Sequence, residues 1–232
     1  MIHAILFDFN GVIIDDEPLQ LQAYQEALKP EGIALTERDY YESLGMDEVT
    51  FVISAFERAG KELSDAALTR VLKRKSELHR RMLENDLPFF PGVVDFIKAC
   101  ARRYTLGIVS MSRRREIEEI LARAELDRLF PVIVSADEVQ VCKPHPECFN
   151  RAFMLLNKAR HAAGESQLSP AECLAIEDSP PGIRAARAAG MHTLGVANTV
   201  PAQALREAGA EVVTPSLADW TTDAIHHLYE TI

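Results

Sequence analysis

Five polar residues, spread over four segments of this sequence, have side chains suited to phosphate chemistry: Asp8, Ser110, Lys143, Glu177 and Asp178. A carboxylate such as Asp8 can act as a covalent nucleophile towards a phosphoryl group. A hydroxyl or a lysine can bind phosphoryl oxygens, and two adjacent acids at the end of a buried strand repel each other unless a cation compensates them. Magnesium suits such acids because it prefers oxygen ligands and substrate phosphate. The pattern therefore predicts phosphoryl chemistry with a bound Mg²⁺.

Each of these residues also has an ordinary structural explanation when it is taken alone. Asp8 could cap the glycine turn that follows it, and Lys143 could be a surface lysine. Ser110 could begin the helix expected from about residue 113, although Ser112 is better placed to cap that helix. Asp178 could likewise cap a helix. The occurrence of all the segments in one chain favours a common site.

Repeated strand–helix units are expected to position these residues. Short apolar runs predict strands at 2–6, 104–110, 132–134, 173–176, 192–196 and 212–213. Helical patterns lie between or after them at 93–100, 113–124, 146–157, 181–189, 202–208 and 217–229. Such units form a doubly wound α/β fold, with a parallel sheet covered by helices on both faces. Ligands bind such sheets at the carboxyl ends of the strands, where Asp8, Ser110 and Glu177-Asp178 are expected.

An all-helical block separates the first strand from the others. Residues 18 to about 85 contain no convincing strand, and Thr36 and Ser64 are suitable helix caps. The apolar residues expected on the buried faces of two of these helices are Val49, Ile53, Phe56, Leu68, Leu72, Leu78 and Met82. We therefore predict a catalytic core at 1–15 and 88–232 with an inserted helical cap at 16–87.

The order and spacing of Asp8, Ser110, Lys143 and Glu177-Asp178 resemble the haloacid dehalogenase (HAD) superfamily, which consists mostly of aspartate-nucleophile phosphatases. The helical block after the first motif resembles the subfamily that includes phosphoglycolate phosphatases and β-phosphoglucomutases. This resemblance covers nearly the whole chain. It implies a Rossmann-like core, a helical cap that chooses the substrate, and Mg²⁺ as cofactor.

The resemblance also implies a role for each residue of the site. Asp8 would be the nucleophile, and Ser110, the neighbouring backbone at Met111 and Lys143 would bind the phosphoryl group. Lys143 stands in a Lys-Pro pattern of the family and would bridge the nucleophile and the phosphoryl oxygens.

Metal ligands follow from the same resemblance. They would be the Asp8 carboxylate, the backbone carbonyl of Asn10 and Asp178, with Glu177 nearby. Replacement of an acid by Asn10 leaves that carbonyl in place, so the metal site would be retained.

Asn10 is the main departure from the family, whose phosphatases carry a second aspartate at this position. That acid protonates the leaving oxygen and later activates water, and its loss typically costs about 10²–10⁴-fold in rate. The chain could be a natural slow or repurposed member, or an engineered variant, or Asp15 or Asp16 could supply the proton. If the site otherwise works as a phosphatase, Asn10→Asp is expected to raise turnover.

The cap carries two residues that could contact substrate, Gln20 and Lys75. Gln20 stands where the mutase presents a histidine, and the loop at 44–48 lacks the arginine with which the mutase holds its second phosphate. Both departures weigh against a phosphomutase. Lys75 resembles a cap lysine that reaches into the site, but its helix is rich in charged residues, so a solvated position is equally compatible.

The composition excludes several partner classes. The 232 residues carry a formal net charge of −10, which argues against nucleic acid and anionic membranes as partners. No signal-peptide pattern or membrane-length apolar run occurs, and the four cysteines form no disulfide or metal pattern. We expect a cytoplasmic, monomeric Mg²⁺-dependent phosphatase of a small phosphorylated metabolite, such as a sugar phosphate or a phosphoglycolate-like compound. A catalytically weakened phosphate-binding sensor and a phosphomutase are the alternatives.

Overall fold

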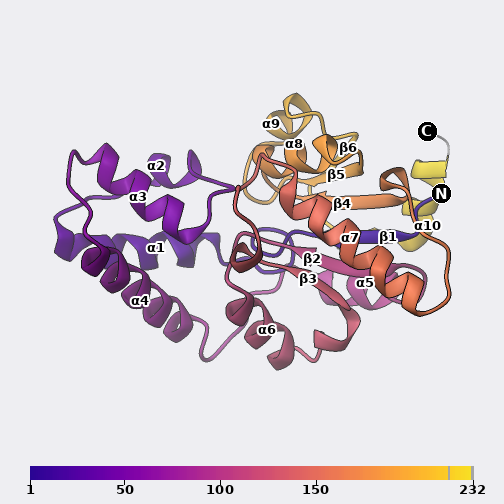
Figure 1. Cartoon of the computed structure of the whole chain (residues 1–232), viewed down its shortest axis with the longest axis horizontal. Helices are drawn as coiled ribbons and strands as arrows, with labels where there is room; N and C mark the ends of the chain where they lie inside the picture. The colour runs from indigo at the N-terminus through magenta and orange to yellow at the C-terminus, as the bar shows by residue number, and fades with distance from the viewer. Residues whose placement is uncertain (219, 231–232) are drawn as a thin grey trace.

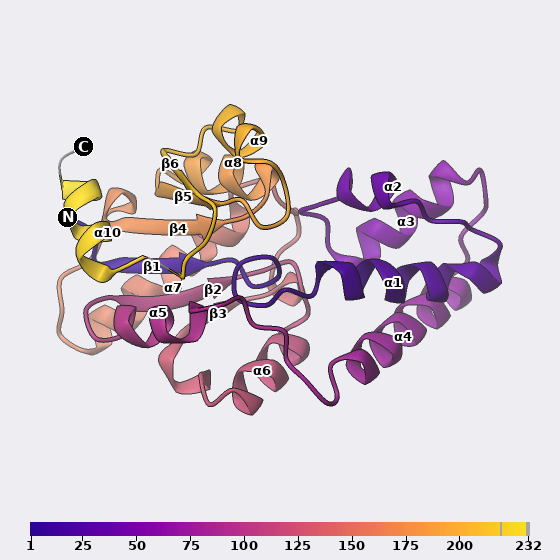
Figure 2. The same cartoon turned by 180° about the vertical axis from the view of Figure 1, so that it is seen from behind.

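The computed structural model describes residues 1–218 and 220–230, and its centre is a six-stranded sheet (Figures 1 and 2). The strands are β1 (Ala4–Phe7), β2 (Thr105–Val109), β3 (Val132–Val134), β4 (Cys173–Glu177), β5 (His192–Val196) and β6 (Val212–Thr214). They lie in the order β3-β2-β1-β4-β5-β6, and every neighbouring pair is parallel. The predicted α/β fold class is thus confirmed.

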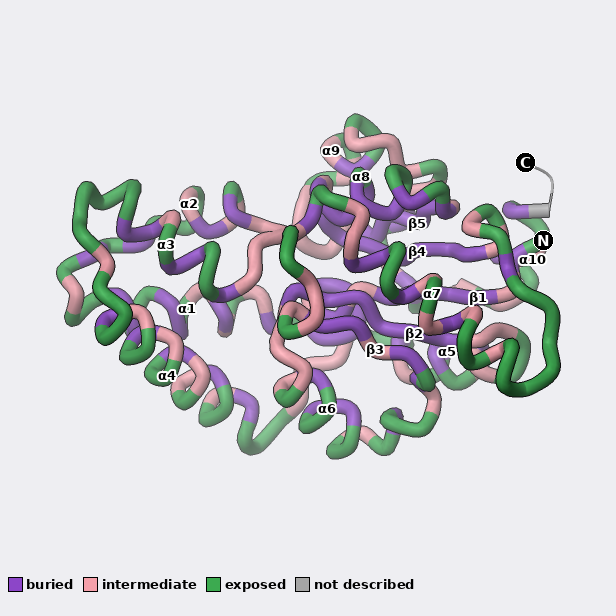
Figure 3. The backbone as a smooth tube through the Cα atoms, viewed as in Figure 1, coloured by how far each residue is buried: buried purple, intermediate pink, exposed green. Residues whose placement is uncertain are grey.

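Helices cover both faces of the sheet because the side chains of a strand alternate between faces. On one face, Ile5 and Phe7 of β1 pack against α5 (Val93–Cys100), α6 (Arg114–Arg123) and α10 (Thr222–Glu230). On the other, Ala4 and Leu6 pack against α7 (Glu147–Ala162) and α8 (Pro180–Ala188). A further helix, α9 (Ala202–Glu207), lies beside β5 and β6. The strands are buried along most of their length (Figure 3), which is why they read as apolar runs in the sequence.

Helix bounds depart from the sequence expectations at two places. Helix α7 continues to Ala162, five residues beyond the predicted end at 157. The closing helix begins at Thr222 and not at Leu217, because the Thr221 hydroxyl accepts the N–H of Ala224 and caps the helix there. Position 219 of that expected helix lies outside the described residues. Within the described part of the chain, no helix is long and apolar enough to cross a membrane.

Four helices stand apart from the sheet, beyond the carboxyl ends of its strands (Figure 1). They are α1 (Glu17–Leu28), α2 (Glu37–Tyr41), α3 (Glu48–Arg58) and α4 (Asp65–Met82), and we call them the helical cap. They enclose a core of their own, which includes Tyr24, Phe51, Phe56 and Val71. The chain leaves the sheet and returns to it side by side, because the N–H of Asp15 donates to the carbonyl of Pro88. The boundaries of the cap as a domain, 16–87, stay a prediction.

The N-caps of two cap helices are confirmed. The Thr36 hydroxyl accepts the N–H of Asp39 in a reciprocal capping box, and the Ser64 hydroxyl accepts the N–H of Ala67. These caps fix the starts of α2 and α4.

The predicted buried faces of two cap helices are confirmed in part. Phe56 of α3 is buried as expected, whereas Val49 and Ile53 are 40% and 39% exposed and α3 buries Phe51 and Val52. Helix α4 buries Ala67, Val71, Lys75 and His79, while the predicted leucines lie at its margin. The reason is that apolar residues occupy more than one row of each helix, and the packing of the helices selects the row.

Candidate active site

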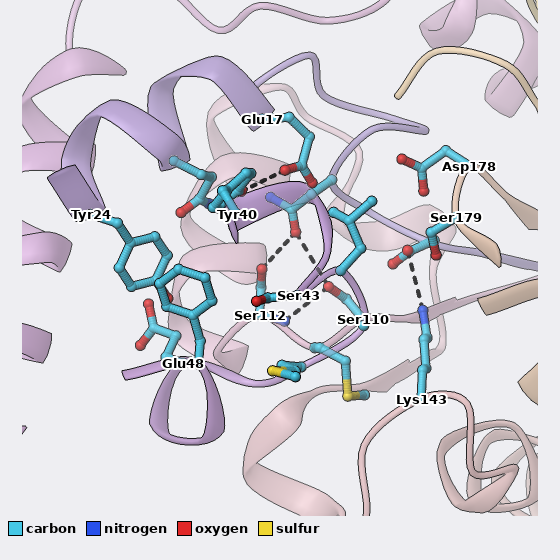
Figure 4. A pocket seen from close by; sticks show the side chains of 18 of the residues that line it. Glu17, Tyr24, Tyr40, Ser43, Glu48, Ser110, Ser112, Lys143, Asp178 and Ser179 are labelled. Carbon is cyan, nitrogen blue, oxygen red and sulfur yellow. Dashed lines mark hydrogen bonds and ion pairs between the residues drawn. The ribbon is translucent and has the colours of Figure 1, made fainter. Parts of the chain in front are cut away.

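The carboxyl ends of three adjacent strands bring the predicted residues together. Asp8 follows β1, Ser110 follows β2, and Glu177 is the last residue of β4. Lys143 comes from the loop before α7, and its ammonium group points towards these strand ends (Figure 4). A pocket of about 100 Å³ opens above them. The pocket is lined by eight of the predicted residues: Asp8, Asn10, Gln20, Lys75, Ser110, Met111, Lys143 and Asp178.

Lys143 is the central cation of the site. Its ammonium nitrogen lies 3.2 Å from Asp8 Oδ2 and 2.7 Å from Glu177 Oε1, and it donates to the carbonyl of Val109 at 3.0 Å. Asp8 is fixed a second time, because its Oδ1 accepts the N–H of Phe9. Asp8 is the one partly exposed member of the acidic group, so it is the carboxylate that a ligand can reach.

Three carboxylates crowd this single cation. Oxygens of Asp8, Glu177 and Asp178 lie within 4.8 Å of one another. Burial and the charge of Asp8 raise the pKa of Asp178 to about 7, and they raise the pKa of Glu177 well above its ordinary value. Burial alone would lower the pKa of Lys143, but Asp8 and Glu177 raise it above its ordinary value.

This donor set fits a divalent cation. The carboxylates exceed the local positive charge, and hard oxygen ligands are those that Mg²⁺ prefers. Asp8 and Asp178 face the pocket and would hold the ion with the backbone at Asn10, whereas Glu177 is engaged by Lys143. The backbone passes very close to Asp178: a Cβ at Gly11, whose φ is 73°, would lie 2.0 Å from Asp178 Oδ2.

The raised pKa values predict how stability depends on pH. A carboxyl group whose pKa is higher in the folded chain than in the unfolded chain favours folding at low pH, and that contribution is lost as the pH rises through the folded-state value. The pKa of Asp178 is about 7 and that of Glu17, also on the pocket wall, about 8. Without Mg²⁺, we expect the Tm to fall between pH 5 and pH 9 by roughly 2–8 °C, since one group shifted by 3 pKa units contributes about 4 kcal/mol at most before relaxation.

Thermal unfolding in EDTA and in excess Mg²⁺ checks this expectation. Mg²⁺ should raise the Tm more at pH 8 than at pH 5.5, because protons compete with the ion for the carboxylates. Asp178→Asn should flatten the dependence, whereas Asp95→Asn, an exposed position on α5, should leave it unchanged. Equal effects of Mg²⁺ at both pH values would contradict the prediction.

Asn10 is held by hydrogen bonds on both sides of its carboxamide. Its Nδ2 donates to both carboxylate oxygens of Asp16 at 2.9 Å, and its Oδ1 accepts from Ser112 Oγ at 2.6 Å and from Ser110 Oγ at 3.4 Å. The expectation that Ser112 caps the next helix is wrong, because Arg113 holds the N-cap position. The Ser112 side chain contacts Asn10 instead (Figure 4).

The cap supplies the other wall of the pocket. Lys75 is 2% exposed, which excludes the solvated position, and its ammonium lies 2.5 Å from Glu48 Oε1 and 3.9 Å from Glu116 Oε2. Glu48 Oε2 is also paired with Arg113 Nε at 2.6 Å. Gln20 lines the pocket, and its Nε2 donates to Asp16 at 3.0 Å.

Several pocket residues were missed by the sequence reasoning. Burial and the charges of Asp178 and Asp16 raise the pKa of Glu17 to about 8, and Tyr40 donates its hydroxyl hydrogen to Glu17 at 2.5 Å. The sequence did contain a signal for Glu17: it is an acid at the first position of α1, the helix with which the chain enters the cap. The remaining lining residues of the cap are Tyr24, Tyr40, Ser43, Leu44, Gly45, Met46, Glu48 and Phe51.

Comparison with known proteins identifies the family. The family model described as haloacid dehalogenase-like hydrolase matches residues 2–190. The chain belongs to the haloacid dehalogenase-like hydrolases. This confirms the resemblance inferred from the motifs and the prediction of an enzyme, a phosphatase-type hydrolase.

Relatives of this HAD-like hydrolase include two curated proteins and many solved structures. A phosphorylated carbohydrates phosphatase of Thermotoga maritima is 31% identical over 212 residues, which cover 89% of this chain and 91% of that protein. The fructose-1-phosphate phosphatase YqaB of Escherichia coli is 30% identical and covers 83% of this chain and 95% of its own. The crystal structure of a β-phosphoglucomutase from Clostridium difficile has a TM-score of 0.85 at 23% identity and covers 100% of this chain and 98% of that one. At this identity the last likeness shows the fold alone.

The cap of this HAD-like hydrolase is closed against the core. Gly45 of the cap leaves no room for a side chain, since a Cβ there would lie 2.8 Å from Pro181 and 3.3 Å from Lys143. Cys142 Sγ donates to Asp47 Oδ2 at 2.9 Å, and burial beside Asp47 raises the pKa of this thiol.

Proposed function

We propose that this HAD-like hydrolase releases phosphate from a small phosphorylated carbohydrate through a covalent phosphoryl group on Asp8. The observation that carries the proposal is the position of Lys143 Nζ between Asp8 Oδ2 and Glu177 Oε1 at the floor of the pocket. This contact and the hydrogen bond from the N–H of Phe9 aim the Asp8 carboxylate, and a nucleophilic carboxylate must be aimed at phosphorus. It also places a cation where the anionic phosphoryl group must approach an anionic nucleophile.

Each residue at the strand ends has a part in this reaction. An oxygen of Asp8 attacks phosphorus, the bond from phosphorus to the carbohydrate oxygen breaks, and water then cleaves the phosphoryl–Asp8 bond. Ser110, the backbone at Met111 and Lys143 bind the phosphoryl oxygens. Asp8, the Asn10 carbonyl and Asp178 would hold Mg²⁺, which would supply charge compensation for the phosphoryl group. Asn10 provides no proton, so protonation of the leaving oxygen is the step that this residue leaves unassisted.

The cap wall favours a substrate with hydroxyl groups and one phosphate. Tyr40, Ser43, Gln20 and Glu48 present hydrogen-bonding groups to the small pocket. Lys75 is compensated by Glu48 and by Glu116, so its charge is not available to a second phosphate. The names of the two relatives, a phosphorylated carbohydrates phosphatase and a fructose-1-phosphate phosphatase, support the same substrate class.

Phosphate release from a panel of esters tests the proposal. We expect monophosphates of sugars, polyols and glycolate to be hydrolysed in Mg²⁺ and not in EDTA. The corresponding sugar bisphosphates should show a kcat/KM about tenfold lower or less, because the pocket is small and the charge of Lys75 is already compensated by Glu48 and Glu116. The ester p-nitrophenyl phosphate serves as a generic substrate because its leaving group departs without protonation.

The panel also separates the alternatives. Isomerisation of a sugar phosphate without net phosphate release would identify a phosphomutase and contradict the proposal. Saturable binding of phosphate with no turnover of any ester would indicate a phosphate-binding sensor. Chromatography of the reaction products and a phosphate assay distinguish these outcomes.

A further inference from the structure

Asp16 lies where the chain passes from the core into the cap. It immediately precedes α1, and its carboxylate contacts three side chains: Asn10 of the core loop, Gln20 of α1 and His79 of α4. The contact with His79 Nε2 is 2.9 Å and joins residues 63 positions apart. One side chain therefore links the residue at the usual acid position of the site to two helices of the cap.

The burial of Asp16 makes these contacts obligatory. The residue is 0% exposed, and its partners His79 and Gln20 are 3% and 6% exposed. A buried carboxylate without hydrogen-bond donors costs far more free energy than an exposed one, because water cannot replace the missing partners. The Asn10 and Gln20 amides donate to it, and His79 Nε2 lies within hydrogen-bond distance of its Oδ2.

The Asn10 amide fits this arrangement and a carboxylate does not. Its nitrogen lies 2.9 Å from each Asp16 oxygen, so an aspartate at position 10 would place an acceptor oxygen against two others at that distance. Like charges at such a separation inside a protein repel strongly. On the opposite side, Asn10 Oδ1 accepts the hydroxyl hydrogens of Ser110 and Ser112, which either an amide or a carboxylate could do.

We propose that Asp16 is a positioning residue that holds the Asn10 carboxamide from behind and makes asparagine, in place of aspartate, the residue that fits position 10 in the closed protein. Residues 10 and 16 then form one amide–acid pair. An acid is tolerated at position 10 only when position 16 carries the amide. The catalytic consequence rests on the proposed phosphatase function, whereas the pairing itself does not. The expectation that Asn10→Asp alone raises turnover changes accordingly: the gain should appear only when Asp16 is exchanged as well.

A double-mutant cycle tests the pairing. The variants are Asn10→Asp, Asp16→Asn and the double variant, with Asp95→Asn on the surface of α5 as a matched loss of one carboxylate. Asn10→Asp should lower the Tm by roughly 5–10 °C, as expected when a buried charge meets no compensating partner. The double variant restores one donor facing one carboxylate and should recover most of this loss. Asp95→Asn should leave the Tm unchanged.

Strong non-additivity of the two Tm changes supports the proposal, since contacting residues couple and distant ones do not. Additive changes, or an Asn10→Asp variant as stable as the wild type, would overturn it. Both outcomes are measured by thermal unfolding alone, so the test holds whether or not the protein hydrolyses phosphate esters.

Steady-state turnover of p-nitrophenyl phosphate and of an alkyl phosphate in Mg²⁺ shows whether Asp16 positions the Asn10 side chain or only stabilises the fold. For Asp16→Asn, kcat should fall about tenfold with little change in KM, because an NH2 group replaces one of the two oxygens that hold the Asn10 amide. The double variant should exceed the wild type on the alkyl ester, because the acid then at position 10 can protonate the leaving oxygen. A double variant that is stable but slower than Asn10→Asp would overturn the positioning role. If the wild type hydrolyses no ester at all, the proposed function fails while the Tm cycle still decides the pairing.

Discussion

Asp8→Asn is expected to reduce turnover by on the order of 10⁴–10⁶-fold, which is the usual consequence of removing a covalent nucleophile. The amide is isosteric and keeps the hydrogen bond from the N–H of Phe9. It cannot attack phosphorus, and it no longer draws the Lys143 ammonium towards the pocket. Phosphate release from the best substrate of the panel provides the measurement.

Stability separates this result from a failure to fold. The charge of Asp8 contributes to the raised pKa of both Glu177 and Asp178, so its removal relieves repulsion in the metal-free protein. The Tm of Asp8→Asn in EDTA should therefore equal or exceed that of the wild type. Beryllium fluoride with Mg²⁺, which mimics a phosphoryl group on a carboxylate, should stabilise the wild type and not the variant. Turnover at the wild-type rate in Asp8→Asn would exclude the covalent mechanism.

Lys143→Met should have the largest effect on stability. The side chain is 2% exposed and compensates two carboxylates, and removing one partner of a buried ion pair typically costs about 3–5 kcal/mol. Methionine keeps most of the apolar stem and removes the ammonium group, which also lies 5.6 Å from the centre of the Phe149 ring, so the loss reports the charge. Mg²⁺ should recover part of the stability, because it compensates the same acids.

Urea unfolding with and without Mg²⁺ gives the free energies, and calorimetric titration with vanadate gives the affinity for a phosphate analogue. Vanadate affinity should fall at least about tenfold, since a charged hydrogen bond contributes roughly 1.5–3 kcal/mol. Lys158→Met, at an exposed position of α7, is the matched control. Unchanged stability and unchanged vanadate binding in Lys143→Met would show that this lysine neither compensates the carboxylates nor binds the phosphoryl group.

The strand ends of the site were predictable because buried parallel strands appear in the sequence as apolar runs that stop at a polar residue. Asp8, Ser110 and Glu177 each stand at such a stop, and the structure brings them together at adjacent strand ends. The bound of a strand can shift by a residue or two without moving its polar end residue to another edge of the sheet. Local patterns thus carry this part of the site.

Contacts between cap and core were not predictable in the same way. Lys75 and His79 lie four residues apart on α4 and continue the buried row of Ala67 and Val71, a spacing that is visible in the sequence. Which row of α4 turns inward, however, depends on how the whole cap sits on the core. The link from His79 to Asp16 follows from that placement and from no local pattern.

The closed cap has a kinetic consequence. Arg113 and Glu116 of the core meet Glu48 and Lys75 of the cap through ionic contacts. Substrate can enter and product can leave only when contacts of this kind separate, and such opening steps often set the rate of an enzyme with a lid. Because dissolved salt weakens ionic contacts as soon as water reaches them, the time that a product remains trapped should shorten as ionic strength rises. The salt content of the surrounding medium would then regulate the pace of the catalytic cycle without touching the reacting groups.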